Sequence, residues 1–227
     1  MYYSGIYYLL SIVLLIVSLI ISARVKSLFK KYSQVGAPYT GRQVAERMMR
    51  ANGIHDVTIA GVGGTLTDNY NPLKKTLNLS ENVIDTPSVA AVAIAAHESG
   101  HAIQHAEGYI PLQIRKTLVP AANICSGASY IFVILGLFLQ RVSFLIDVGV
   151  LLFAVVVLVH FITLPVEVNA SRRALASLET MGLVANEESE GMARKLLRAA
   201  AMTYFVSLAS VMVQFLRLLT IAAGRRK

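Results

Sequence analysis

Four long stretches almost free of charged residues constrain the fold of this chain more than any other feature. Residues 1–23 contain no Asp, Glu, Lys, Arg or His, and residues 117–140 contain none either. Residues 142–164 hold one acidic residue and one histidine, and residues 199–224 hold a single arginine. A transmembrane helix needs about 20 consecutive, mostly apolar residues. Each stretch is therefore long enough to cross a bilayer, and we expect about four transmembrane helices.

The overall composition agrees with a membrane protein. The mean hydropathy is +0.59 and only 15% of the residues are charged, which is too apolar for an ordinary soluble domain. The net charge of +8 comes largely from basic residues near the apolar stretches, where such residues commonly meet anionic lipid headgroups. No nucleic-acid-binding motif accompanies them. We therefore expect the lipid bilayer, and no nucleic acid, as a partner.

The distribution of basic residues predicts an orientation. The run "RVKSLFKK", residues 24–31, directly follows the first apolar stretch. Because cytoplasmic loops are enriched in Lys and Arg, we expect a multi-pass protein of the cell membrane with residues 24–116 and 165–198 in the cytoplasm. These two segments hold sixteen of the 21 basic residues.

The carboxy terminus fits this orientation less well. With four full spans, Arg141 and the basic tail, residues 225–227, would lie outside the cell. A basic tail prefers the cytoplasm, however. Residues 199–224 are therefore interpreted as either a transmembrane or a re-entrant helix.

Residues 24–116 are long enough for one small domain, and their patterns change along the chain. Residues 41–53 favour a helix, because four apolar side chains fall on one face: Val44, Ala45, Met48 and Met49. Residues 57–60 and 74–79 are short β-prone runs that flank glycines and the turn-forming "DNYNP", which predicts two or three strands. The run 74–79 is either a plain hairpin strand or an edge strand to which an extended peptide substrate adds.

A second helix is predicted in "DTPSVAAVAIAAHESGHAIQHAEGY". Thr86 suits the N-cap, Pro87 suits the first helical position, and Gly108 suits the position just past the end. The predicted helix covers residues 87–107. Its first half is apolar, and its second half carries several polar side chains that can take part in chemistry.

The second half of this helix contains an H-E-x-x-H motif. His97 and His101 are four residues apart, so they lie on one face and their imidazoles can converge on one ion. In such motifs two neutral imidazoles bind Zn²⁺, and a glutamate outside the metal's ligands, here Glu98, takes a proton from the activated water. The alternative is a buried helix with two core histidines and a glutamate paired to a base. Two features favour the metal site. The apolar run before His97 makes an unpaired charge costly to bury, and Gly100 lacks a side chain, which leaves room for a close approach.

A catalytic zinc site of this kind needs a third protein ligand. Glu167 is the candidate. Two predicted spans separate it from His97, so both residues lie on the same side of the membrane. Pro165 suits the start of a helix, which would place Glu167 in the first turn, where the helix dipole stabilises a carboxylate. His105 is the rival ligand, but three ligands from one straight helix beginning at His97 would spread over about 12 Å. We therefore prefer Glu167, and expect His105 to support a ligand or to face solvent.

Other polar residues receive weaker interpretations. His160 lies in the third apolar stretch, where a structural polar contact is expected, and His55 is expected to be an ordinary surface residue. A peptidase also needs a donor that stabilises an oxyanion. Tyr70, Tyr109 and Arg172 are conceivable donors, and the sequence ranks none of them.

Several segments resemble a known family. "LTDNYNP", "NLSENVIDTPSVAAVAIAAHESGHAIQH", "PVEVNASRRALASLETMGLV" and "AAAMTYF" are similar to the YugP-type membrane zinc metallopeptidases, and the resemblance covers most of the chain. It implies that His97 and His101 bind zinc, that Glu98 is the catalytic carboxylate, and that Glu167 matches the downstream glutamate of the family. More distantly, the chain resembles membrane-embedded gluzincins, in which an Asp follows four residues after that glutamate. Here that position is Ser171.

Taken with the resemblance, these patterns predict a mainly α integral membrane protein with about four transmembrane helices and a small α+β zincin-like metallopeptidase domain. The expected segments are transmembrane helix 1 (1–23), the α+β metallopeptidase region (24–116), transmembrane helix 2 (117–140), transmembrane helix 3 (142–164), a helical segment with the third zinc ligand (165–198), and a transmembrane or re-entrant helix 4 (199–224).

The expected function is that of a zinc-dependent endopeptidase with one catalytic Zn²⁺ and its active site on the cytoplasmic side. It would hydrolyse peptide bonds of peptides or proteins, membrane proteins included, with Glu98 as general base. The alternative is a catalytically inactive zinc-binding scaffold or partner protein. An intramembrane site-two protease is disfavoured, because the apolar run before His97 is too short for a span.

Overall fold

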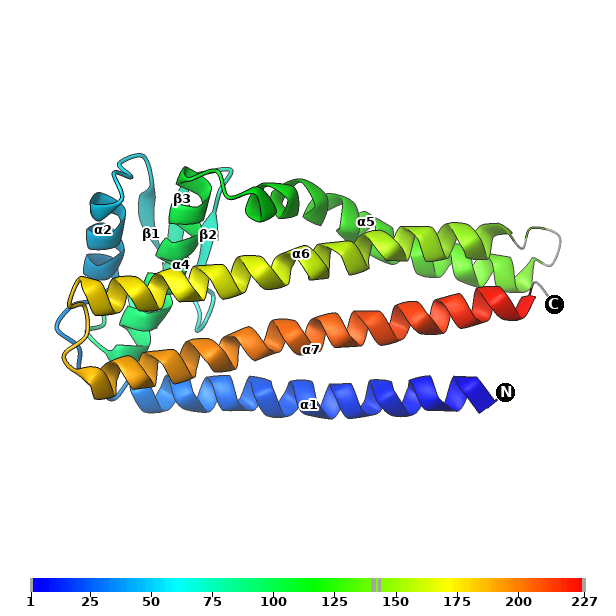
Figure 1. Cartoon of the computed structure of the whole chain (residues 1–227), viewed down its shortest axis with the longest axis horizontal. Coiled ribbons are helices and arrows are strands. Elements are labelled where there is room, and N and C mark those ends of the chain that lie inside the picture. The colour runs from blue at the N-terminus through cyan, green and yellow to red at the C-terminus, as the bar shows by residue number, and fades with distance from the viewer. Residues whose placement is uncertain (1, 140–141, 143, 226–227) are drawn as a thin grey trace. The chain divides into compact units, whose positions relative to one another are not determined.

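The computed structural model describes residues 2–139, 142 and 144–225. Arg141, Arg226 and Lys227, for which the sequence predicts a membrane side, lie outside the described residues. Helices dominate the described chain (Figure 1). In chain order its elements are α1 (Tyr2–Tyr32), α2 (Gly41–Ala51), β1 (Thr58–Val62), β2 (Asn69–Asn71), β3 (Thr76–Ser80), α3 (Glu81–Ile84), α4 (Val89–Ala106), α5 (Ile110–Phe138), α6 (Phe144–Thr180) and α7 (Glu187–Arg225).

Four of these helices are long and apolar enough to cross a membrane: α1, α5, α6 and α7. Apart from Leu139 and Val142, they contain all described residues of the four stretches predicted from the sequence. The prediction of four candidate spans is thus confirmed at the level of length and composition. The last stretch lies within a single helix, α7, that runs without a break from residue 187 to residue 225. This continuity favours a span over a re-entrant segment.

The helix predicted to begin at Pro165 does not begin there, which corrects the sequence analysis. Pro165 lies inside α6, a single helix of 37 residues, and Glu167 is therefore far from a first turn. A proline inside a helix costs about 3 kcal/mol, because it removes one backbone hydrogen bond and crowds the preceding turn. Beyond the proline, α6 buries one side chain per turn, and this packing offsets that cost: Val166, Ala170, Ala174 and Leu178.

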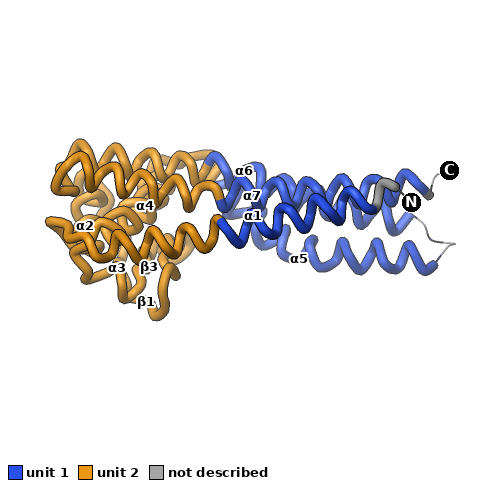
Figure 2. Tube along the Cα trace, turned by 90° about the horizontal axis from the view of Figure 1, so that it is seen from below, with its two compact units in different colours: residues 1–20, 113–165, 203–227 blue, residues 21–112, 166–202 orange. Residues whose placement is uncertain are grey.

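The chain divides into two compact units, which are coloured separately in Figure 2. Unit 1 comprises Met1–Ile20, Gln113–Pro165 and Thr203–Lys227, and unit 2 comprises Ile21–Leu112 and Val166–Met202. Within unit 1, α5 and α6 pack closely. The hydroxyl of Ser129 donates a hydrogen bond to the carbonyl oxygen of Gly149 at 2.7 Å, and a Cβ atom on Gly149 would lie 2.9 Å from the carbonyl oxygen of Ser129.

Unit 2 contains a three-stranded sheet in the order β1-β3-β2. β1 pairs in parallel with β3, and β2 pairs antiparallel with β3. The two or three predicted strands are thus present, with bounds shifted by one to two residues. The interpretation of residues 74–79 as a free edge strand is wrong, because β3 is the central strand and both of its edges are already paired.

The core of unit 2 forms around the first half of α4. Every residue from Val89 to Ala96 is buried, and α2 packs against this helix. α4 begins later than predicted: Ser88 is the N-cap, and its hydroxyl accepts a hydrogen bond from the backbone N–H of Ala91 at 3.2 Å. Thr86 and Pro87 therefore precede the helix. Because α4 is anchored by this apolar half, its second half is held rigidly where the polar motif begins.

Candidate metal centre

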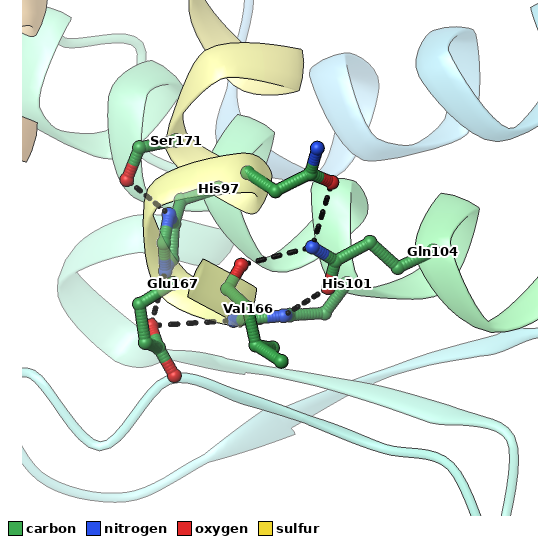
Figure 3. A network of polar contacts seen from close by, with 7 residues as sticks. His97, His101, Gln104, Val166, Glu167 and Ser171 are labelled. Atoms are coloured by element: carbon green, nitrogen blue, oxygen red, sulfur yellow. Dashed lines mark hydrogen bonds and ion pairs between the residues drawn. The ribbon is translucent and has the colours of Figure 1, made fainter. Parts of the chain in front are cut away.

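The histidine pair lies on one face of α4, as its spacing predicts. The ring centroids of His97 and His101 are 4.9 Å apart and the rings meet edge to face at 81°. Their side chains are 14% and 10% exposed, so both are largely shielded from solvent. Figure 3 shows both imidazoles directed toward Glu167 of α6.

Glu167 completes a group of three potential metal ligands. Its Oε2 lies 3.3 Å from Nε2 of His97 and 3.5 Å from Nε2 of His101, and its side chain is only 2% exposed. The ligand atoms of the three residues all lie within 4.8 Å of one another. Two imidazole nitrogens and one carboxylate oxygen are a donor set that suits Zn²⁺. Among the described residues, the group contains neither Glu98 nor His105.

Gln104 orients the imidazole of His101. Its Oε1 accepts a hydrogen bond from Nδ1 of His101 at 3.0 Å, and its Nε2 donates to the carbonyl oxygen of Val166 at 2.9 Å (Figure 3). The same Nε2 also donates to Oδ1 of Asn169 at 2.9 Å. Both partners of Nε2 are acceptors, so the amide can face only one way. Nδ1 of His101 therefore carries a proton.

The tautomer of His101 is set by a chain of contacts that ends at an arginine. Nε of Arg173, which can only donate, bonds Oδ1 of Asn169 at 2.8 Å, and this identifies the oxygen of the asparagine amide. In the neutral imidazole, Nε2 then presents a lone pair to the carboxylate of Glu167. Two acceptor atoms at 3.5 Å repel each other unless a proton or a metal cation lies between them. The arrangement thus fits a metal ion, on the chemistry of the donors alone.

The other histidine has an analogous support. Oγ of Ser171 lies 3.2 Å from Nδ1 of His97 and can accept its proton, which leaves Nε2 directed at Glu167. Imidazoles that bind metals usually bond a neighbouring acceptor through the other ring nitrogen. Ser171 occupies the position that the resemblance singled out. Gln104 was missed in the sequence analysis, although its position three residues after His101 on the same helical face was a usable signal.

A glycine allows α4 and α6 to approach closely at this point. A Cβ atom on Gly100 would lie 2.7 Å from the carbonyl oxygen of Ala170. Real Cβ atoms do not approach backbone oxygens so closely, so no larger residue fits without moving a helix. Ala170 is one turn beyond Glu167 on α6. The sequence analysis expected Gly100 to permit a close approach, and the approaching group is the backbone of α6.

Glu98 lies beside the group. Its side chain is buried, and this burial raises its pKa to about 7; the charge of His97 opposes the shift, whereas the charges of Glu167 and Asp68 add to it. A hydrogen bond from the backbone of Tyr70 also acts on Glu98, and it lowers the pKa. Strand β2, which contains Tyr70, therefore runs next to this carboxylate.

The remaining histidines lie elsewhere. Nδ1 of His105 lies 2.8 Å from the hydroxyl of Tyr70. His160, in unit 1, bonds the carbonyl oxygen of Val156 through Nδ1 at 2.9 Å, which is the structural contact expected from the sequence. His55 is an exposed loop residue. Of the unranked oxyanion donors, Arg172 is exposed on α6.

Comparison with known proteins assigns the chain to a family. It is 40% identical over 205 residues to the "Putative membrane protease YugP" of Bacillus subtilis (strain 168), an alignment that covers 89% of this chain and 90% of that protein. No solved structure matches it. The sequence model of the family described as "Putative neutral zinc metallopeptidase" matches residues 7–223. The chain belongs to this family.

Proposed function

We propose that the protein is a membrane-bound, zinc-dependent endopeptidase whose Zn²⁺ is held by His97, His101 and Glu167. The observation that carries the proposal is the convergence of three ligand atoms within 4.8 Å, with the imidazoles oriented through Nδ1 so that both Nε2 atoms face the carboxylate. A zinc ion bound there supplies Lewis-acid activation of water and of the scissile carbonyl.

Glu98 is the proposed general base. It neighbours His97 in the chain and is buried, yet it lies outside the group of three ligand atoms. Its carboxylate oxygen would take a proton from the attacking water and pass it to the nitrogen of the leaving amine. One carboxylate thus serves as base and then as acid. A short sheet beside the helix with the H-E-x-x-H motif supports the proposal of a zincin-like domain.

The outer edge of β2 is the proposed binding place for an extended peptide. Among the described residues, β2 is paired on one side only, with β3, and the backbone of its Tyr70 reaches Glu98. A peptide that adds to this edge through backbone hydrogen bonds would pass beside Glu98. The proposal replaces the earlier hypothesis for residues 74–79, since β3 has no free edge. The basic run at 24–31 supports a cytoplasmic active site.

Glu98→Gln tests the function directly. The full-length protein is purified in detergent, and zinc content and cleavage of an unstructured protein such as casein are measured for both forms. We expect the variant to retain its zinc and to lose at least about 100-fold in turnover, because general acid–base catalysis contributes roughly 10²- to 10⁴-fold. Retention of zinc with unchanged proteolysis contradicts the role of Glu98. Absence of proteolysis from both zinc-loaded forms favours the zinc-binding scaffold.

A further inference from the structure

A second site of a different kind lies in unit 2. A groove of about 810 Å³ runs between the carboxy-terminal end of α1 and the loop that joins β1 to β2, and it is lined by nine residues of these segments and of the region around α3. None of the three proposed zinc ligands lines it. The groove therefore requires its own explanation.

The groove is electropositive. Lys26 and Lys30 are one helical turn apart on α1, so their ammonium groups project on the same side, and both line the groove. Both lysines are exposed, and neither forms an ion pair within the part of the chain that the structure describes. No acidic side chain is among the described residues that line the groove. These features favour an anionic ligand.

Neutral hydrogen-bond donors and an apolar floor complement the two charges. The amide nitrogen of Asn82 donates to the hydroxyl of Thr65 at 3.1 Å, which holds the loop before β2 against α3. The second amide hydrogen of Asn82 and the hydroxyl hydrogen of Thr65 can then reach a ligand. The buried Phe29 and the partly buried Leu66 also line the groove and supply apolar surface. Cations with clustered amide and hydroxyl donors suit the oxygens of a phosphate.

The place of the lysines in α1 points to the source of that phosphate. α1 continues without a break from its apolar stretch, which ends at Ala23, through Lys26 and Lys30. At 1.5 Å per residue these lysines lie about 5 Å and about 10 Å beyond Ala23 along the axis. The headgroup region of a bilayer is roughly 5–8 Å thick on each side. Lys26 lies within this headgroup region, and the long side chain of Lys30 tilts toward the helix amino terminus and so reaches back toward it. Both ammonium groups can therefore meet lipid phosphates.

We propose that the groove binds the headgroup phosphate of an anionic lipid, with Lys26 and Lys30 as its cationic contacts and Asn82 and Thr65 as neutral donors. The proposed binding is confined to the groove and does not involve every basic residue of α1. Arg24 and Lys31 belong to the same helix and carry the same charge, but they do not line the groove. The proposal does not depend on the peptidase activity.

Binding of short-chain lipids to the detergent-solubilised full-length protein tests it. The probes are dioctanoyl phosphatidylglycerol, dioctanoyl phosphatidylcholine and glycerol 3-phosphate, and Kd is measured by calorimetry. We expect phosphatidylglycerol to bind the wild type at least about tenfold more tightly than either other probe. Lys26→Gln/Lys30→Gln should weaken that binding about tenfold or more, because each lysine adds to the electrostatic attraction between the groove and the anionic headgroup.

The matched control is Arg24→Gln/Lys31→Gln, which removes two charges from the same helix outside the groove. We expect this variant to change Kd less than about threefold. Thr65→Val, which removes no charge, should weaken binding several-fold, and all variants should keep the zinc content and elution profile of the wild type. An equal loss in both double variants would overturn the groove in favour of a diffuse basic face. Equal affinity for glycerol 3-phosphate or for phosphatidylcholine would overturn an anionic lipid as the ligand.

Discussion

Gly100 of α4 and Ala170 of α6 are in such close contact that a single methyl group would not fit between them: a Cβ atom at residue 100 would lie 2.7 Å from the carbonyl oxygen of Ala170. Gly100 directly precedes His101 and lies one helical turn after His97, and Ala170 lies one turn after Glu167. The distance between the two helices at this point thus controls whether one ion can reach all three proposed ligands.

Gly100→Ala should therefore destabilise the protein and weaken zinc binding together. Overpacking of a tight contact typically costs about 1–3 kcal/mol. The control is Gly191→Ala in α7, another helical glycine of unit 2, where nothing lies within 4 Å of the added Cβ. We expect that variant to be as stable as the wild type or slightly more so, since alanine favours helices. Thermal unfolding and zinc titration measure both effects, and equal behaviour of the two variants contradicts the spacing argument.

Gln104→Ala should lower zinc affinity about 10- to 100-fold, because it frees the imidazole of His101 and leaves the carbonyl oxygen of Val166 without its amide donor. Gln104→Glu separates these two effects. It keeps an acceptor for His101 but places a second acceptor against Val166 and Asn169. We expect it to cost more stability than affinity. Competition with a zinc-binding dye measures affinity, and unchanged affinity in Gln104→Ala would exclude its orienting role.

Ser171→Ala should weaken zinc binding, whereas Ser171→Asp should not. The alanine removes the acceptor that faces Nδ1 of His97, and we expect roughly tenfold weaker binding. The aspartate offers a stronger, charged acceptor for the same proton and should bind zinc at least as tightly as the wild type. The same dye competition serves here. A fall of similar size in both variants would mean that Ser171 acts through packing.

His101→Gln and His105→Gln provide a matched pair on one helix. Only His101 belongs to the group of ligand atoms, whereas His105 bonds Tyr70. We expect His101→Gln to lose its zinc at micromolar concentration and His105→Gln to retain about one zinc per chain, measured by atomic emission after desalting. Loss of zinc from His105→Gln to the same extent would indicate that His105 is a zinc ligand.

Cysteine labelling checks the predicted membrane side. In a Cys125→Ser background, Lys74→Cys places a thiol on an exposed turn of unit 2, and Leu139→Cys places one beyond α5. With a membrane-impermeant maleimide and intact cells, we expect labelling of Leu139→Cys, and labelling of Lys74→Cys only after permeabilisation. The reverse pattern would put the proposed active site outside the cell.

Some features of this protein follow from the sequence because they depend on short-range physics. The four apolar stretches and the helical pairing of His97 with His101 are read from neighbours a few residues apart. Helix boundaries follow less directly, because tertiary packing also decides where a helix begins and ends. Ser88 competes with Thr86 as N-cap, and the burial of Val166 and Ala170 carries α6 through Pro165, a tertiary effect that outweighs a local signal.

The sequence alone determined the candidate spans, the helix with its H-E-x-x-H motif and the family resemblance, since all of these are written in local order and composition. Only the tertiary structure decided that the carboxylate of Glu167 meets imidazoles about 70 residues away, that Gln104 orients one of them, and that β3 is a central strand. Such contacts depend on how helices and strands pack across the chain. At Gly100 the sequence indicates room for a close approach, but only the packing shows that the approaching group is the backbone of α6 and that a methyl group does not fit there.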